Sequence, residues 1–414
     1  MELYDYQKTW VKKIIDYYKN TPEIFHPKAN LFLDMGLGKT ITALYIAKEL
    51  SPKRLLIVCP KSLISMWEYE LSRVFHISYT RYEDLDMLVS ENIMTAVCIK
   101  NYEQFLSIKS VSNFDLVILD EAHKIKNCSS KTHKCISKYV KTTRTLCLTG
   151  TPITRDLMDL FGILTCTGPQ IWNGLTAAQF KARYITNGGA SRTYELMQLI
   201  SPYTIFGKIT DFIDMPEWED IVIPVHPDVS QLIQLDGVYA SDKKALERIC
   251  EAQQITGSVE YASPKRNDCE QLISDILDNG EKVVLFVKYT KEYEYFINKY
   301  KDICTGINGS VKDRFDKVQE FENNPKIKIF VGNLQTASLG ITLIKAHKCI
   351  FYSETHNWGD MDQAKRRIYR TGQNHFCTYY YLIAQGTVDQ IIHKSNLNKT
   401  DLIEDFINFY GGIK

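Results

Sequence analysis

A short glycine-rich stretch contains the residues best suited to binding a phosphate. It runs Asp-Met-Gly-Leu-Gly-Lys-Thr over residues 34–40, between an apolar run and an amphipathic one. The two glycines allow the backbone to curl until successive N–H groups face an anion. Lys39 can reach the β- and γ-phosphates of a nucleotide, and the Thr40 hydroxyl can bind Mg²⁺. The residues expected to bind nucleotide here are Gly36, Leu37, Gly38, Lys39 and Thr40.

This phosphate motif is incomplete. Leu33 stands where the first glycine of the full G-x-x-x-x-G-K-T pattern belongs. The stretch after Thr40 has helical spacing, so the N-terminal dipole of a helix would face the same anion. A plain strand–turn–helix without a ligand remains the alternative for these residues alone.

A second stretch places two carboxylates directly after an apolar run. Residues 117–119 are Val-Ile-Leu, and Asp120 and Glu121 follow, about 80 residues after the glycine-rich stretch. In a nucleotide hydrolase, Asp120 would help to hold Mg²⁺ and Glu121 would orient and deprotonate the attacking water. The alternative is a helix N-terminus whose dipole is complemented by acidic residues.

The third stretch is basic. Gln363, Arg367 and Arg370 are spaced i, i+4 and i+7, which predicts that all three lie on one helical face. Planar guanidinium groups can bind phosphate oxygens in pairs, as a developing triphosphate charge requires. The first half of the chain offers no such arginine, so we expect the second half to deliver it across a cleft. For the neighbouring Lys365 and Arg366, a solvated basic face or a nucleic-acid patch is the preferred interpretation.

Short apolar runs alternate with helical stretches over residues 1–208, which predicts right-handed crossovers and a parallel sheet. Ligands bind at the carboxyl ends of such strands. The polar or turn-forming residues expected at that edge are Asp34, Pro60, Asp120 and Thr149. The predicted strands are 31–33, 55–59, 95–99, 116–119 and 144–148.

The alternation returns after a segment of different character. Prolines interrupt an extended stretch early in residues 209–264, and 229–254 has helical spacing, so this segment is expected to be a connector with a helical part. Residues 265–414 are expected to form a second α/β domain that ends in a helical tail over 387–410. Its predicted strands are 283–287, 327–331, 349–352 and 378–383.

Composition narrows the class of protein. The 414 residues, 44% hydrophobic and 24% charged, are typical of a globular protein with two or three domains. No apolar run approaches the roughly 18 residues that a membrane span needs. The 11 cysteines are scattered singly, which favours a reducing compartment such as the cytoplasm. The net charge of +1 excludes general attraction to nucleic acid, so any such site must be a local groove.

Taken in order, the motifs resemble those of superfamily 2 helicase-like ATPases of the Swi/Snf branch. The matching stretches span nearly the whole chain: Tyr6-Gln7, residues 34–40, 56–62 with Trp67, 120–127, 148–153, 336–343, and an R-x-x-R-x-G-Q that ends at Gln373. Departures from the family pattern occur at Thr342, Arg366 and Tyr369, and residues 354–360 lack the family's W-N-P order.

The resemblance implies two tandem RecA-like parallel-sheet domains with an ATP site in the cleft between them. It implies ATP and Mg²⁺ as cofactors, catalytic roles for Lys39, Asp120, Glu121, Gln363, Arg367 and Arg370, metal binding by Thr40 and Asp120, and nucleotide contacts by Gln7 and Gly340. Nucleic acid would lie across both domains. The residues expected to contact it are Pro60, Lys61, Ser62, Trp67, Asn101, Tyr102, Lys288, Thr336 and Ser338.

The family therefore predicts a DNA-dependent ATPase that moves along double-stranded DNA or displaces proteins bound to it. Two alternatives remain open: a strand-separating helicase or motor subunit of a larger complex, and a nucleotide-switched clamp with little turnover. The small size and the lack of recognisable reader modules favour a minimal motor from a bacterium or a phage-infected cell. A recruiting protein partner is not identified by the sequence.

Overall fold

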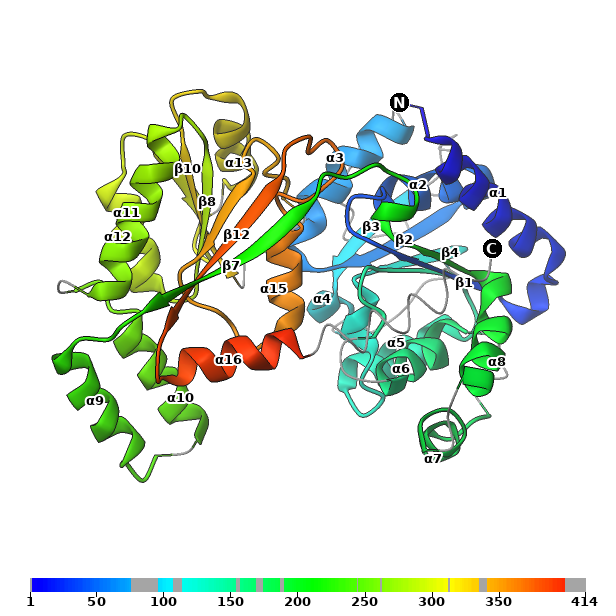
Figure 1. Cartoon of the computed structure of the whole chain (residues 1–414). Helices are drawn as coiled ribbons and strands as arrows, with labels where there is room; N and C mark the ends of the chain where they lie inside the picture. Colours follow the sequence, from blue (N-terminus) through cyan, green and yellow to red (C-terminus); the bar gives the residue numbers. More distant parts are fainter. Residues whose placement is uncertain are drawn as a thin grey trace. The chain divides into compact units, whose positions relative to one another are not determined.

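Parallel strands with helices on both faces form the centre of each half of the chain in this computed structural model (Figure 1). The structure describes residues 2–75, 96–106, 114–153, 157–168, 174–186, 190–243, 245–260, 263–311, 313–334 and 341–398. A first compact unit extends to Ile213 and a second begins at Asp214. Each unit contains one six-stranded sheet in which every pairing is parallel, as predicted.

The first sheet has the strand order β3-β2-β4-β5-β1-β6. Its strands are β1 (Lys28–Leu33), β2 (Arg54–Cys59), β3 (Ala96–Asn101), β4 (Leu116–Asp120), β5 (Arg144–Thr149) and β6 (Thr204–Gly207). β1 and β4 are buried along their whole length, as expected for strands covered on both faces.

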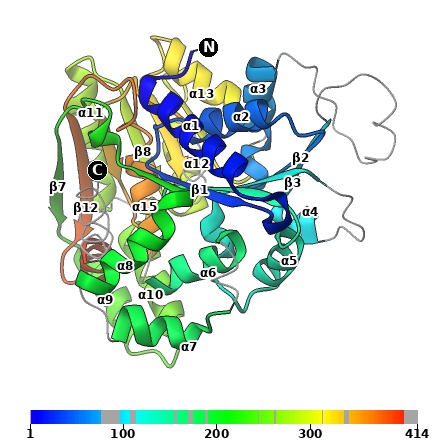
Figure 2. The same cartoon turned by 90° about the vertical axis from the view of Figure 1, so that its right-hand side faces the viewer.

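Helices cover both faces of this sheet. Figures 1 and 2 show α1 (Asp5–Asn20), α2 (Lys39–Leu50) and α3 (Ile64–Phe75) on one face. On the other face lie α4 (Tyr102–Leu106), α5 (Lys131–Val140) and α6 (Leu157–Thr167). Two further helices follow, α7 (Ala177–Phe180) and α8 (Ala190–Ile200). The buried core on the α5–α6 side includes residues from β4, α5 and α6.

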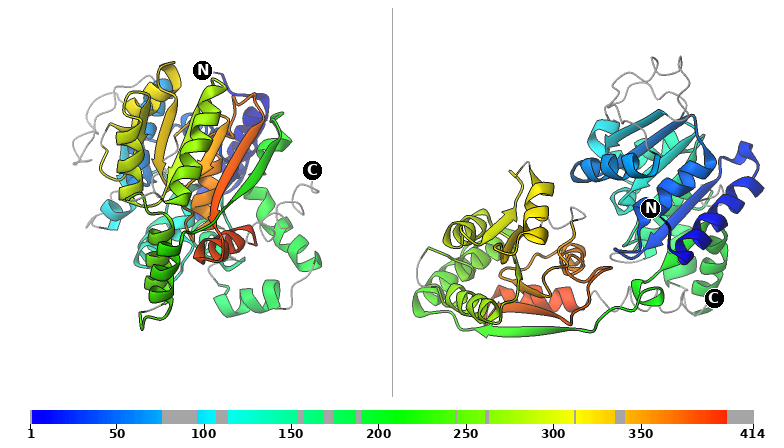
Figure 3. Two further views of the ribbon diagram at one scale, coloured as in Figure 1. Left: turned by 60° about the vertical axis from the view of Figure 1, so that its left-hand side comes forward. Right: turned by 90° about the horizontal axis from the view of Figure 1, so that it is seen from above.

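The second sheet has the order β7-β12-β11-β8-β10-β9. Figure 3 shows β7 running beside β12 at one edge. The strands are β7 (Trp218–Val225), β8 (Val283–Val287), β9 (Cys304–Ile307), β10 (Ile329–Asn333), β11 (Lys348–Phe351) and β12 (Cys377–Ala384).

Alternate residues of these strands face two separate cores. Val283, Leu285 and Val287 of β8 pack with α11 (Pro264–Asp278) and α12 (Thr290–Lys299). Their neighbours Val284 and Phe286 pack with α13 (Arg314–Asn323) and α15 (Trp358–Lys365). A smaller apolar cluster joins α9 (Val229–Tyr239), α10 (Ala245–Thr256) and α16 (Val388–Leu397).

The structure differs from the predicted elements at three points. β6, β7 and β9 were not predicted, because two are only four residues long and the third carries a proline and exposed side chains. The segment 209–264, expected to be a connector, contributes β7 to the second sheet and two helices where one was expected. The predicted tail 387–410 contains α16, and its remainder lies outside the described residues after position 398. Within the described part of the chain, no helix has the length and apolar character to cross a membrane.

Candidate active site

Four strands of the first sheet end where the sequence predicted. β1 ends before Asp34, β2 ends before Pro60, β4 ends at Asp120 and β5 ends at Thr149. Because all of these strands are parallel, their carboxyl ends meet at one edge of the sheet. This edge brings the glycine-rich loop and the acidic pair together.

The loop after β1 curls around the Lys39 ammonium. Gly36 and Gly38 have φ angles of 95° and 76°, a left-handed conformation that glycine adopts without strain. The Lys39 Nζ donates hydrogen bonds to the carbonyl oxygens of Leu33, at 2.8 Å, and Asp34, at 3.1 Å. Lys39 and Thr40 begin α2, so the positive end of this helix dipole faces the loop.

Gln7 is bonded to this loop from α1. Its Nε2 donates to the Leu37 carbonyl at 3.0 Å, and its Oε1 accepts from the Tyr4 N–H at 3.0 Å. A Cβ atom at position 38 would lie 2.3 Å from Gln7 Nε2, so only glycine allows this close approach. Tyr4 and Tyr6, which precede Gln7 in the chain, stack on one another with ring centroids 5.5 Å apart. Gln7 therefore lies against the glycine-rich loop, and its contact with a nucleotide stays a prediction.

Asp120 lies in the interior with two donors on its carboxylate. The Trp67 indole N–H donates to Oδ2 at 2.8 Å, and the Glu121 N–H donates to Oδ1 at 2.9 Å. Burial, and then the charge of Glu121, raise the pKa of Asp120 to about 7, while the indole bond opposes the rise. A cation beside Asp120 would stabilise the ionised carboxylate, and the carboxylate of Asp120 and the hydroxyl of Thr40 are oxygen donors of the kind that Mg²⁺ prefers.

Glu121 is presented by a strained backbone. Its φ of 51° is left-handed, which is unusual for a residue with a side chain. The turn that follows is a single 3₁₀ helix, Ala122–Ile125, and it places His123 Nδ1 3.2 Å from Glu121 Oε2. Strain of this kind is often found where a side chain must be aimed at a substrate.

Three of the expected nucleic-acid contacts lie in the interior instead. Trp67 is fully buried against Asp120. Tyr102 is buried as well, and its hydroxyl donates to the Asp120 carbonyl at 2.7 Å. Asn101 is buried and accepts from the Gln104 N–H. The structure therefore places Trp67 and Tyr102 in support of Asp120, while the Asn101 side chain bonds to Gln104. Sequence reasoning missed this role because residue type alone does not show that α3 and α4 pack beside β4.

The other expected contacts have mixed positions. Pro60 and Ser62 are half-buried and Lys61 is exposed, all directly after β2. Lys288 follows β8 and is half-buried, with its Nζ bonded to Gln253 Oε1, and burial lowers its pKa. Three residues lie outside the described ranges, in the gap between 334 and 341: Thr336, Ser338 and Gly340.

The prediction of one helical face for Gln363, Arg367 and Arg370 was wrong. α15 ends at Lys365, and the chain continues as a turn. The two arginines are nevertheless brought together, because both donate to the Ile341 carbonyl, at 3.4 Å and 3.2 Å. Arg367 is buried and Arg370 is half-buried, and burial lowers the pKa of Arg370. Gln363 is buried within α15.

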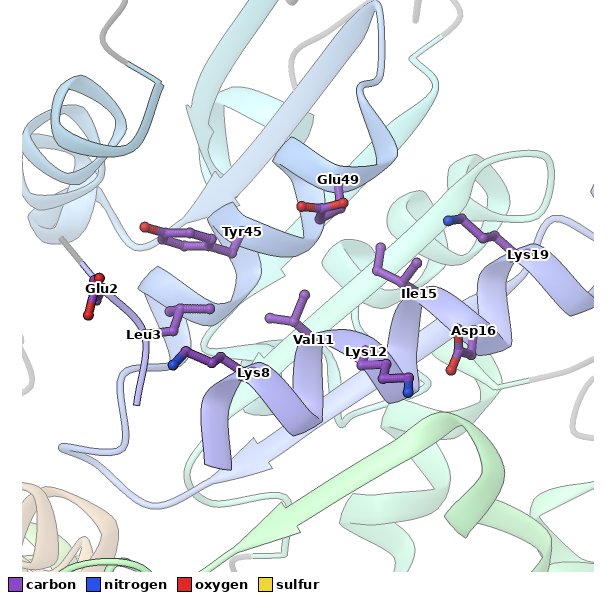
Figure 4. Close-up of a pocket in the computed structure, with 10 residues that line it drawn as sticks. All are labelled: Glu2, Leu3, Lys8, Val11, Lys12, Ile15, Asp16, Lys19, Tyr45 and Glu49. Atoms are coloured by element: carbon purple, nitrogen blue, oxygen red, sulfur yellow. The ribbon is translucent and has the colours of Figure 1, made fainter. Parts of the chain in front are cut away.

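A hollow of about 560 Å³ lies elsewhere on the first unit, between α1 and α2 (Figure 4). Its lining combines apolar side chains, among them Leu3, Val11 and Ile15, with lysines and carboxylates. None of its lining residues belongs to the glycine-rich loop or to the acidic pair. Within the described ranges, no group of three or more histidine, cysteine, aspartate or glutamate side chains could hold a metal ion.

Comparison with known protein families gives two matches along the chain. A model described as the SNF2-related domain matches residues 6–233, and one described as the helicase conserved C-terminal domain matches residues 265–372.

Several curated relatives are similar over most of the chain. The DNA repair and recombination protein RDH54 of Saccharomyces cerevisiae is 26% identical, over 90% of this chain and 50% of its own length. The mouse Chromodomain-helicase-DNA-binding protein 1-like is 24% identical, over 92% and 48%. An uncharacterized ATP-dependent helicase of Mycoplasma pneumoniae is 25% identical, over 91% and 40%. The chain thus spans about half the length of the curated relatives it matches, and their organisms do not single out a bacterium or a phage as its source.

Among solved structures, the Sulfolobus solfataricus SWI2/SNF2 ATPase core in complex with dsDNA is 23% identical. The match covers 98% of this chain and 93% of that one, with a TM-score of 0.48.

Proposed function

The chain belongs to the SNF2-related family of helicase-like ATPases, and from that premise we propose that it hydrolyses ATP to move along double-stranded DNA without separating the strands. The observation that carries the proposal is the meeting of the Lys39 loop and the Asp120–Glu121 pair at one edge of a parallel sheet. A loop that binds phosphates and a carboxylate that activates water are the two parts that nucleotide hydrolysis needs.

In this proposal each group near the nucleotide has one task. Lys39 exchanges its bonds to the Leu33 and Asp34 carbonyls for phosphate oxygens, with the loop N–H groups around it. Thr40 and Asp120 would hold Mg²⁺, which neutralises phosphate charge when bound. Glu121 orients the attacking water and takes its proton.

Gln363, Arg367 and Arg370 act from the second unit. We propose that ATP favours a closed state in which the guanidinium groups stabilise the charge that develops on the γ-phosphate. Such an arginine is worth about 10³–10⁵ in rate. Hydrolysis would remove these contacts between the arginines and the γ-phosphate and allow the units to separate. The contacts with DNA would then shift along the strand.

The proposed DNA contacts are sequence-tolerant. Pro60, Lys61 and Ser62 follow β2 at the carboxyl edge, and hydroxyl and lysine groups of this kind position a phosphate backbone without reading bases. Lys288, Thr336 and Ser338 are proposed to do the same from the second unit. DNA as the partner is supported by relatives whose names state DNA repair and recombination, and DNA binding.

The decisive experiment is steady-state ATP hydrolysis by the purified protein, alone and then with duplex DNA, single-stranded DNA or RNA at low salt. We expect duplex DNA, but not single-stranded DNA or RNA, to stimulate ATP hydrolysis strongly. A second assay then measures whether the protein displaces the third strand from a DNA triplex. Equal stimulation by single strands would favour a strand-separating helicase. Absence of hydrolysis with every nucleic acid would contradict the motor and favour a nucleotide-switched clamp.

A further inference from the structure

Lys365 lies in a cage of aromatic rings on the second unit. Its Nζ is 4.0 Å from the ring centre of Trp218, 4.6 Å from that of Tyr379 and 5.9 Å from that of Tyr381. The same ammonium donates to both carboxylate oxygens of Asp220, at 2.7 Å and 2.8 Å. The sequence suggested a solvated basic face or a nucleic-acid patch for this lysine, whereas its ammonium is engaged by aromatic rings and a carboxylate of the same unit.

Two neighbouring strands build this cage. Trp218 and Asp220 are two residues apart on β7, and Tyr379 and Tyr381 are two residues apart on β12, so each pair faces the same side of the sheet. The register pairs Asp220 with Tyr379, which puts the carboxylate next to the rings. The Tyr381 hydroxyl donates to Asp220 Oδ1 at 3.1 Å, which fixes the acceptor that Lys365 meets.

The cage contacts the main chain of Lys365 as well as its side chain. The Tyr379 hydroxyl donates to the Lys365 carbonyl at 2.9 Å. Phe351 of β11 stacks on Tyr381, with 4.9 Å between ring centres and 14° between planes, and so supports the ring from the next strand. A cation held over several rings and paired with a carboxylate has little freedom to move.

Lys365 lies next to the two arginines in the chain, so the contacts that hold it also bear on them. It is the last residue of α15, and the turn that carries Arg367 and Arg370 starts immediately after it. Arg367 is bonded back to this helix end through its N–H to the Ala364 carbonyl, at 3.1 Å. Its carbonyl accepts from the Leu343 N–H at 2.9 Å, so the turn is fixed at both sides.

We propose that Lys365 is a positioning residue for hydrolysis: its cage on β7 and β12 fixes the point from which the two arginines are presented to the nucleotide. This inference rests on the proposed ATPase function. Loss of the ammonium would leave α15 in place through its buried Met361 and Ala364 but would release its last turn. A misplacement of about 1 Å in such a group can cost up to about 10²-fold in rate.

The test measures kcat and KM for ATP with saturating duplex DNA. Lys365→Met keeps the apolar stem and removes the charge, and kcat is expected to fall about tenfold while KM for ATP changes less than twofold. Lys365→Arg should retain at least half of the wild-type kcat, because a guanidinium also stacks on aromatic rings and pairs with a carboxylate. The matched control is Lys291→Met, which makes the same change at an exposed pair with Glu260 and should leave both constants unchanged.

Two further measurements separate positioning from loss of fold. Trp218 emission should change in Lys365→Met and not in Lys291→Met, because the ammonium lies against that indole. If Lys365→Met does not fold, Tyr379→Phe carries the test, since it keeps the ring and removes only the bond to the Lys365 carbonyl; its kcat should fall about threefold. If the folded variants keep the wild-type kcat, the positioning role of Lys365 is overturned, while the proposed ATPase function stands. A wild-type protein that hydrolyses no ATP would overturn the proposed function and the inference with it.

Discussion

At the scale of single residues, the candidate site depends on how Asp120 and Glu121 are held. The Trp67 indole and the Tyr102 hydroxyl bond to the carboxylate and carbonyl of Asp120, so two aromatic side chains fix the end of β4. Residue type and spacing predicted Lys39, Asp120 and Glu121, because phosphate and water activation need those groups in that order. They did not predict the two aromatic supports, because these depend on helix packing.

Loss of the reacting groups should separate ATP binding from hydrolysis. Lys39→Ala is expected to reduce phosphate release to background, because the ammonium no longer reaches the phosphates. Glu121→Gln should do the same while a fluorescent ATP analogue still binds, since only the base is lost.

Arg370→Ala should bind ATP and hydrolyse it at least about 10³-fold more slowly. Lys53→Ala, an exposed lysine before β2, is the control. Normal turnover in Glu121→Gln would contradict its role as the base.

Removal of the Trp67 donor should weaken both fold and activity. Trp67→Phe keeps an aromatic ring but leaves a buried carboxylate oxygen without its partner, at a cost of about 1–3 kcal/mol in free energy of unfolding. Because the indole lowers the pKa of Asp120, the substitution should raise that pKa above its value of about 7. Chemical denaturation checks the stability, and NMR titration of Asp120 without Mg²⁺ checks the pKa, which should lie higher than in the wild type. Trp10→Phe is the control, and an unchanged Asp120 titration in Trp67→Phe would rule out this effect.

At the scale of elements, close packing sets the position of the acidic pair. The chain after Glu121 passes α6, where a Cβ atom at position 162 would lie 1.7 Å from the Lys126 carbonyl oxygen. The Lys126 Nζ bonds to Asp159 Oδ2 of α6 at 3.1 Å, and His133 of α5 bonds to the Ile125 carbonyl at 2.7 Å. Two helices therefore hold the turn that presents Glu121.

Gly162→Ala tests this packing. The added methyl group overlaps backbone atoms that cannot rotate away, so the first unit should lose about 3 kcal/mol in free energy of unfolding. Gly237→Ala in α9 is the control, because a Cβ there meets nothing within 4 Å. A helical alanine should stabilise that position by up to about 1 kcal/mol. Equal effects of the two substitutions in urea denaturation would show that the contact does not constrain the fold.

The pair of His393 with Glu354 ties α16 to the segment after β11. Burial alone lowers the pKa of His393, but the hydrogen bond and charge of Glu354, 2.6 Å away, raise it overall. A raised pKa means stability that is fully present below the unfolded value of about 6.5 and lost as pH rises through the folded value. The stability difference between wild type and His393→Gln should therefore shrink between about pH 6 and pH 8, as measured by urea denaturation. A difference that stays constant with pH would contradict the charged pair, and His26→Gln, at an unrelated site, controls for general pH effects.

Sequence patterns predicted the buried strands of both sheets because continuous apolar runs bounded by turns are typical of parallel strands. They failed where contacts between distant parts of the chain decide whether an element forms or where it ends. β7 forms because β12 offers a partner, although its proline and exposed residues argue against a strand. The end of α15 at Lys365 could not be predicted either, because the spacing of Gln363, Arg367 and Arg370 continues a helical pattern beyond it.

At the scale of the whole molecule, the net charge of +1 leaves DNA binding to local contacts. Duplex affinity should still fall as salt rises, because phosphate contacts release counterions. Lys61→Ala should weaken binding equally for all sequences and reduce the slope of log affinity against log salt by about 1. Lys53→Ala is the control, since Lys53 precedes β2 and Lys61 follows it. Fluorescence anisotropy on labelled duplexes checks the slopes, and equal slopes for the two variants would remove Lys61 from the interface.

The second sheet ends, among the described strands, at β7, whose outer backbone groups have no strand beside them. Such an edge is a template for self-association with another chain. Here two exposed carboxylates lie at the start of the strand, Glu217 just before it and Glu219 within it, and Pro224 lies near its end. Like charges on two approaching copies repel, and proline offers no N–H to share. The segment that builds the Lys365 cage thereby also protects the protein against edge-to-edge aggregation.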